Sequence, residues 1–248
     1  MTTHLYCVLP QERTSVPPGL SGLAGAAVRA VPVDGLVAWV SDVSKGVPLS
    51  YEGVRTHDAV VEAALETGTT PVPARFGQRF SSDDELKAAL ASRAASVGTV
   101  LADVQGYVEM TLIITPSTRR MLRDLEPVIP EIFEPEATGP GRKYLEALRR
   151  REAASGAVQD AIDELARRLS DAVGDLARRV AVHDSVTPMP LRTISYLVAR
   201  RDVAKYKEAI AGVAAGREFR FLSIGPRAPY SFSALSDSGG AHGMKLAD

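Results

Sequence analysis

The sequence has little cysteine and few aromatic residues: one cysteine, one tryptophan and 6% aromatic residues among 248. The single cysteine, Cys7, excludes an internal disulfide, and its place in the apolar run LYCVLP indicates a buried thiol in a reducing compartment. No apolar stretch approaches the ~20 residues of a membrane-spanning helix, and no basic segment precedes an apolar core at the N-terminus. We therefore expect a cytoplasmic protein that does not enter a membrane.

An excess of charge of either sign is also absent, because 29 basic residues face 30 acidic ones. Proteins that bind nucleic acids or anionic membranes normally carry a basic excess, so neither is an expected partner. The 45% hydrophobic and 24% charged residues are ordinary for a globular chain. The length fits one large domain or two small ones.

Recognisable catalytic and ligand-binding patterns are missing as well. The four histidines show no paired metal-ligand spacing, and the chain has neither a phosphate-binding loop nor a dinucleotide-binding glycine motif. His183, Asp184 and Ser185 are sequence neighbours and point apart, so we read them as a helix-end turn rather than a triad. His57 and Asp58 are expected on the polar face of a helix. The sequence predicts no enzyme activity, no metal and no cofactor.

What is present is an alternation of strand and helix patterns in the first part of the chain. Strands are predicted at 4–9, 69–80 and 107–115, and a hairpin is predicted where two apolar runs flank Asp34-Gly35. Residues 51–68 have helical spacing, and Ser82 with Glu85 in capping-box register opens a second helix. This order predicts an α+β, two-layer, ferredoxin-like N-terminal domain over residues 1–116, with helices covering one face of a sheet.

Residues 117–236 form the predicted C-terminal domain, which begins with a charged and mostly helical segment. This segment has an apolar stripe at helical spacing, which fits packing on the chain's own core better than it fits a coiled coil. The stripe comprises Val158, Ile162, Leu165, Leu169, Ala172, Leu176 and Val180. A strand at 191–200, a helix at 202–216 and a strand at 218–225 follow. We predict a modified ferredoxin-like domain with a long helical insertion, and a flexible tail over residues 237–248.

One carboxylate is unusual for its surroundings. Glu109 lies inside an otherwise apolar strand, where it either faces solvent or needs a cationic partner. Arg75, on the neighbouring predicted strand, is the candidate partner, and such an ion pair would have a structural role.

Five stretches, taken in order, resemble the gas vesicle protein F and L family (GvpF/GvpL). They are HDAVVEAALETGTTPVPARFGQRF at 57–80, GYVEM at 106–110, GRKYL at 141–145, SYLVAR at 195–200 and GPRAPYSF at 225–232. In the last stretch the family usually has tryptophan and proline where this chain has Arg227 and Ala228, so an aromatic contact there is expected to be lost or replaced.

The resemblance implies a non-enzymatic accessory protein of gas vesicles, which binds the small hydrophobic shell protein and other accessory proteins during assembly. A shell subunit with an exposed apolar face aggregates unless another protein covers it. The resemblance does not separate the F from the L paralogue or indicate an oligomeric state. The alternative function is a small-ligand sensor or enzyme, which would need a pocket with convergent polar groups around Glu109, His57 and Arg75.

The matching motifs make seven residues candidates for interaction or motif roles: Arg75, Phe76, Gly77, Glu109, Pro229, Tyr230 and Phe232. Packing of Tyr230 and Phe232 on the protein's own core and contact of both rings with a partner are equally open. For the VPARFG stretch we favour a structural role, with Phe76 buried, Gly77 allowing a bulge or close approach, and Arg75 paired locally.

Overall fold

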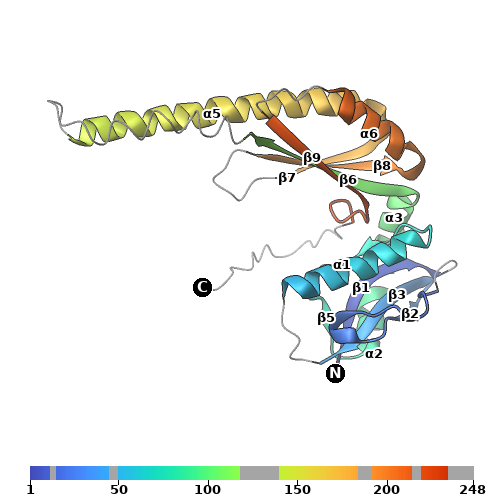
Figure 1. The fold of residues 1–248 in the computed structure, drawn as a ribbon. Coiled ribbons are helices and arrows are strands. Elements are labelled where there is room, and N and C mark those ends of the chain that lie inside the picture. Colours follow the sequence, from blue (N-terminus) through green and yellow to red (C-terminus); the bar gives the residue numbers. More distant parts are fainter. Residues whose placement is uncertain (12–14, 45–49, 118–139, 184–190, 214–218, 234–248) are drawn as a thin grey trace. The chain divides into compact units, whose positions relative to one another are not determined.

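The structure is a computed structural model that describes residues 1–11, 15–44, 50–117, 140–183, 191–213 and 219–233, without the side chains of 140–155 and 157. The chain divides into two compact units (Figure 1). The first comprises Met1–Val108 together with the chain from Arg227, and the second comprises Glu109–Pro226. These limits differ from the predicted boundary after residue 116. The predicted tail at 237–248 lies outside the described residues.

The first unit contains a sheet with the order β2-β3-β1-β4, and β5 also pairs with β1. These strands pair in antiparallel fashion. The predicted hairpin is present, because Asp34 and Gly35 both have positive φ and join the two arms tightly. The strands are β1 (Thr2–Pro10), β2 (Arg29–Val33), β3 (Leu36–Val43), β4 (Val72–Pro73) and β5 (Arg79–Phe80).

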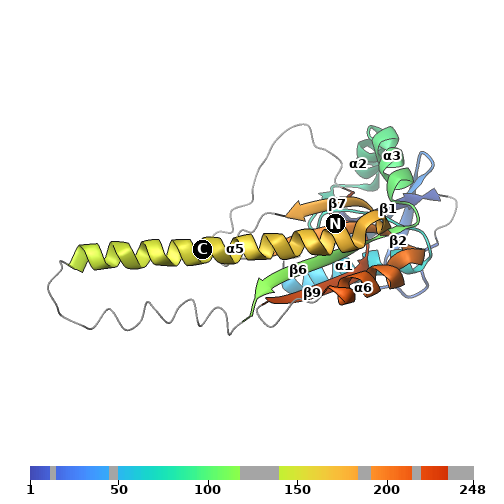
Figure 2. The ribbon, with the colours of Figure 1, turned by 90° about the horizontal axis from the view of Figure 1, so that it is seen from above.

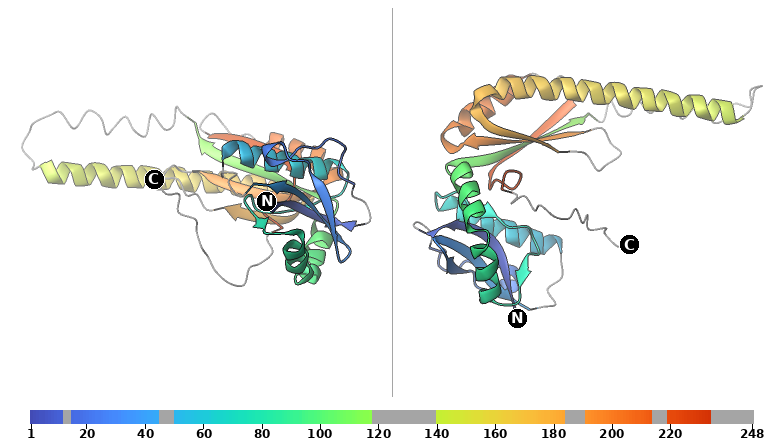
Figure 3. Two further views of the ribbon diagram at one scale, coloured as in Figure 1. Left: turned by 90° about the horizontal axis from the view of Figure 1, so that it is seen from below. Right: turned by 180° about the vertical axis from the view of Figure 1, so that it is seen from behind.

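Helices cover both faces of this sheet, whereas the sequence predicted helices on one face. α1 (Tyr51–Glu66) packs over Trp39 and its neighbours, and α2 (Asp83–Ala91) with α3 (Ala94–Val104) lies on the opposite side (Figure 3). Ser82 caps α2 as predicted, since its Oγ accepts from the Glu85 amide at 3.2 Å. The single predicted second helix is therefore two helices.

The second unit contains β6 (Tyr107–Pro116), α5 (Pro140–Val173), β7 (Ala177–His183), β8 (Arg192–Ala199), α6 (Val203–Gly212) and β9 (Phe219–Arg227). Its sheet has the order β7-β8-β6-β9. α5 and α6 lie on the same side of this sheet, and α5 extends past its end (Figures 1 and 2). The apolar core forms between this sheet and the two helices.

The predicted apolar stripe is right in its first four positions. Leu176 also packs against the core but lies outside the helix, and Ala172 and Val180 are exposed. Val158, Ile162, Leu165 and Leu169 are buried in the core of the second unit, whereas Ala172 is exposed on the helix. The helix ends at Val173, because Gly174 has a φ of +47° and breaks the helical path. The following residues form a 3-10 turn and then β7, so Leu176 and Val180 do not belong to the helix.

The predicted fold class is confirmed at the level of an α+β protein with two antiparallel sheets. The two sheets also have corresponding strand orders. In β2-β3-β1-β4 and in β7-β8-β6-β9, the order across the sheet is the second, third, first and fourth strand of the unit. The second unit has α5 between its first two strands, where the first unit has a connection with the short 3-10 helix Leu23–Gly25.

Candidate interaction sites

The stretch PVPARFG is held to α1 through a buried histidine. His57 is 2% exposed, so its predicted place on the polar face of the helix is wrong. Its Nε2 lies 3.0 Å from the carbonyl oxygen of Ala74, which accepts, so Nε2 carries the proton. In the neutral ring Nδ1 then accepts, and the His4 Nε2 at 3.0 Å donates to it.

His4 is completely buried, and its Nδ1 has no hydrogen-bond partner among the described residues. Burial, the neighbouring His57 and Arg79 lower the pKa of His4 to about 3. Burial also lowers the pKa of His57. The rings of Tyr6 and Phe76 surround the pair, with ring centroids 4.8 to 6.0 Å apart. Both histidines are therefore neutral at physiological pH, and they form a structural junction of β1, α1 and the PVPARFG stretch.

The three VPARFG candidates occupy different environments. Phe76 is half-buried against the core of the first unit, and its ring approaches Gly53 so closely that a Cβ there would lie 2.9 Å from it. Gly77 has a φ of +89°, which favours glycine. Arg75 is exposed, and the described residues offer it no ion pair, so its expected local pairing is not seen among them.

The C-terminal octapeptide returns to α1. Arg227 forms an ion pair with Asp58, and its Nε lies 3.6 Å from Glu62 Oε1. The same Glu62 oxygen accepts from the Ala228 amide at 3.3 Å. Ala228 is buried against the α1 side of the core. The position where the family usually has tryptophan thus carries a charged contact to α1.

The remaining octapeptide residues form a tight turn that packs on the first unit. The amide of Tyr230 donates to Ala228 at 2.9 Å, and the amide of Phe232 donates to Pro229 at 3.1 Å. Pro229 and Phe232 are buried, and Tyr230 is half-buried against the same core as Ala228. Both rings therefore pack on the chain itself, and the half-buried Tyr230 keeps part of its surface accessible.

Glu109 lies in the second unit within a network of hydroxyl groups. Ser195 Oγ donates to Glu109 Oε1 at 2.8 Å, and Thr111 Oγ1 donates to the same oxygen at 3.1 Å. Because Ser195 gives its proton to the carboxylate, the His183 Nε2 at 3.0 Å donates to Ser195. The network joins β6, β7 and β8. Arg75 belongs to the first unit, and its pairing with Glu109 stays a prediction.

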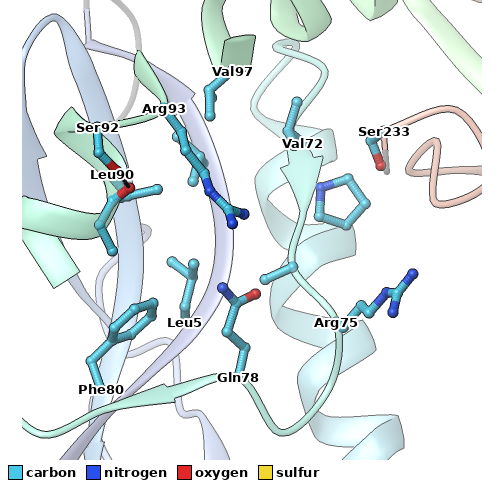
Figure 4. Close-up of a pocket in the computed structure, with 14 residues that line it drawn as sticks. Leu5, Val72, Arg75, Gln78, Phe80, Leu90, Ser92, Arg93, Val97 and Ser233 are labelled. Carbon is cyan, nitrogen blue, oxygen red and sulfur yellow. Dashed lines mark hydrogen bonds between the residues drawn. The ribbon is translucent and has the colours of Figure 1, made fainter. Parts of the chain in front are cut away.

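A hollow of about 540 Å³ opens between β1, β4 and the α2–α3 pair in the first unit. Leu5, Val8, Val72, Leu90 and Val97 give it mainly apolar walls. Figure 4 shows Arg93 and Gln78 directed toward one another across it, while Arg75 points away. Neither His57 nor Glu109 lines this hollow, so it does not bring together the three polar residues that the alternative function would require.

Two features of these sites were missed by sequence reasoning. The pairing of His4 with His57 joins residues 53 positions apart, and the pairing of Ser195 with Glu109 joins residues 86 positions apart. A polar residue inside an apolar strand indicates a buried polar partner. Glu109 was recognised by this signal, and His4 in β1 carries the same signal.

The described residues also limit other kinds of site. Nowhere in the described parts do three His, Cys, Asp or Glu side chains gather closely enough to hold a metal ion. None of the described helices combines the length and apolar character needed to cross a membrane.

Comparison with known proteins places these motifs in one family. A family model described as gas vesicle synthesis protein GvpL/GvpF matches residues 2–234. Gas vesicle protein F1 of Halobacterium salinarum is 27% identical over 239 residues, which cover 94% of this chain and 93% of the relative. Gas vesicle protein F of Haloferax mediterranei is 31% identical over 122 residues, which cover 48% of this chain and 57% of the relative.

Two solved structures share the fold. The crystal structure of GvpF from Anabaena sp. PCC7120 aligns with a TM-score of 0.76 at 18% identity, covering 95% of this chain and 99% of that one. GvpF from Microcystis aeruginosa aligns with a TM-score of 0.71 at 19% identity, covering 94% and 99%. The resemblance inferred from the five motifs is thus confirmed: the chain belongs to the gas vesicle synthesis protein GvpL/GvpF family.

Proposed function

We propose that this protein is a non-enzymatic assembly factor of gas vesicles, which binds the small hydrophobic shell protein and other gas vesicle proteins. The observation that carries the proposal is the family match over residues 2–234, nearly the whole chain. A shell protein with an apolar face needs a partner that covers or orders it before assembly. We further propose that the protein acts in the cytoplasm, associated with the vesicle.

Each unit is proposed to be a folding domain of ferredoxin-like type. The order β6-α5-β7-β8-α6-β9 with the sheet order β7-β8-β6-β9 supports this for the second unit. The first unit has the corresponding sheet order, with a loop in place of the first helix and α2–α3 added on the other face.

The candidate motif residues other than Glu109, which belongs to the second unit, are proposed to act mainly by holding the first unit together. The PVPARFG stretch and the octapeptide both pack on α1, through Ala74 in one case and Arg227 and Ala228 in the other. Arg75 is exposed, and Phe76, Gly77 and Tyr230 are half-buried in the first unit. Phe76 packs closely on Gly53 and Gly77 provides a positive φ, so Arg75 and Tyr230 are the ones we propose for partner contact.

The alternative, a ligand sensor or enzyme, draws less support. The apolar walls of the 540 Å³ hollow and the separation of its lining from His57 and Glu109 favour packing or protein contact over catalysis. No second function is proposed on this basis.

The test is to express a complete set of gas vesicle genes with and without this chain, and to recover the tagged chain from the same cells. We expect the shell protein to co-purify and vesicles to be lost when the chain is absent. Normal vesicles without the chain, together with no co-purified gas vesicle protein, would contradict the proposal.

A further inference from the structure

β7 is an edge strand of the second sheet. Among the described strands it pairs with β8 only, through the antiparallel register that sets Val180 opposite Tyr196 and Val182 opposite Ile194. An edge strand presents a row of backbone N–H and C=O groups that another extended segment can pair with. Its register shifts between Ala177 and Arg179, and the residues from Arg179 to His183 continue in regular register, which is long enough for such pairing.

The helices that cover β8 do not cover the apolar side chains of β7 on the same face of the sheet. Tyr196 and Ile194 are 0% and 3% exposed beneath the helices, whereas Val180 and Val182, on the same face of the sheet, are 52% and 57% exposed. Two adjacent β-branched side chains on one face of an edge strand form an apolar strip that a partner strand would bury.

The other described edges are obstructed. β2 contains Pro32, β4 has two residues and ends in Pro73, and β9 contains Pro226. Proline lacks the N–H that a ladder needs and blunts an edge against further pairing. β5 has two residues. β7 is the long edge, within the described part of the chain, that contains no proline.

The charges on β7 select the kind of partner. Arg178 and Arg179 are both exposed at the start of the strand. β7 of a second copy would offer these arginines no acidic partner, because the strand ARRVAVH contains neither Asp nor Glu. A segment with acidic side chains beside its apolar ones would instead complement this edge.

We propose that the outer edge of β7 accepts an extended segment of another protein as an additional strand, with apolar side chains over Val180 and Val182 and an acidic side chain near Arg178 or Arg179. This mode of recognition uses main-chain hydrogen bonds for affinity and alternate side chains for specificity. The proposal rests on the proposed function in one respect, because the partner offered in its test is the gas vesicle shell protein.

The test co-expresses the full chain with the shell protein and compares three variants. Val180→Lys with Val182→Lys charges the apolar strip, and Arg178→Glu with Arg179→Glu reverses the charge without altering the valines. Leu222→Lys is the matched control, because Leu222 is 59% exposed and lies on the opposite edge strand, β9. Hydrogen exchange of the β7 amides is measured in the wild-type chain, alone and in the complex.

We expect both β7 variants to reduce the co-purified shell protein about tenfold, and Leu222→Lys to leave it within about twofold. The β7 amides should exchange more slowly in the complex. If wild-type chain retains the shell protein while both β7 variants bind as well as wild type, or if the β7 amides stay unprotected, the inference is overturned. If wild-type chain retains no shell protein, the proposed function fails and the β7 inference fails with it.

Discussion

His57 joins the start of the longest family-like stretch to its second half. It lies at the start of residues 57–80, and the carbonyl that it binds, that of Ala74, lies in the middle of PVPARFG. The motif is thus explained as a helix and a short strand tied by one buried hydrogen bond. The hydrogen bond from His4 to His57 connects this pair to β1. Replacing either ring with a side chain that cannot hydrogen-bond would leave a buried polar group without its partner.

The buried histidine pair predicts acid sensitivity of the first unit. The pKa of both rings is lowered by burial, to about 3 for His4. An unfolded histidine has a pKa of about 6.5, so between about pH 6.5 and pH 3 the unfolded chain binds more protons than the native one. The free energy of unfolding should therefore fall as pH falls below about 6.5, on the order of 1.4 kcal/mol per pH unit from His4, with a further contribution of the same sign from His57.

The measurement is urea unfolding of the full chain between pH 7 and pH 5, followed by the fluorescence of Trp39 in the first unit. The window stays above the range in which ordinary carboxylates titrate. His4→Gln with His57→Gln should flatten the slope, even where it lowers stability at pH 7. An equal pH slope in wild type and double variant would contradict the assignment.

The octapeptide rings should contribute unequally to stability. Phe232 is 4% exposed and Tyr230 is half-buried. Phe232→Ala should destabilise the first unit by about 3–5 kcal/mol, the usual range for a buried phenylalanine. Tyr230→Ala should lower the free energy of unfolding by a smaller amount. If the proposed function holds, it should also weaken co-purification of the shell protein. Tyr230→Ala with unchanged binding would remove Tyr230 from the proposed partner contacts.

At the scale of elements, the hairpin between β2 and β3 depends on one glycine. Gly35 has a φ of +76° beside Asp34 at +42°, the backbone of a tight two-residue turn. Gly35→Ala should destabilise the protein by about 1–2 kcal/mol, because a Cβ is strained in this region. Gly98 is the matched control: it lies inside α3, where an added Cβ would meet open space, and Gly98→Ala should stabilise by about 0.5–1 kcal/mol.

Thermal or urea unfolding of both glycine variants beside wild type measures this difference. A Gly35→Ala protein as stable as Gly98→Ala would show that the turn does not require the positive φ. The test is independent of the gas vesicle partner.

Local patterns predicted the helices and strands best where a cap or turn residue was present. Ser82 with Glu85 and Asp34 with Gly35 are such signals, and both were confirmed. The prediction that the helix continues after Val173 was wrong, because the apolar spacing of Leu176 and Val180 matches the helical pattern by chance. Val180 and Val182 also alternate as in a strand, and Gly174 decides between the two patterns.

The candidate sites were predicted less completely than the elements. The motif residues were identified, but their partners come from distant parts of the chain: Arg227 pairs with Asp58, 169 positions away. Neither periodicity nor composition reports such a pairing. The buried environment of His57 was missed for the same reason, since His4 and Ala74 reach it only in the folded unit.

At the scale of the whole molecule, the first unit is discontinuous in sequence. It consists of Met1–Val108 and the chain from Arg227, with the second unit between them. The predicted boundary at 116 and the assignment of the octapeptide to the C-terminal domain differ from this arrangement. β6 begins two residues before the division, so the strand itself gave no sign of where one unit ends.

Truncation after Pro226 should affect the first unit selectively. It removes Arg227, Ala228 and Phe232, which contact α1 or lie in the core. Hydrogen exchange should become faster in α1 and remain near wild type in α5 and β8. Unchanged protection of α1 in the truncated chain would show that the returning segment contributes little to the first unit.

The returning segment also sets an order of events on the ribosome. Residues 109–226, which number 118, are synthesised between the two parts of the first unit. At 5–20 residues per second this interval lasts roughly 6–24 s. During translation the second unit is complete before the first can close over Ala228 and Phe232, so a prematurely terminated chain leaves that core open to proteases.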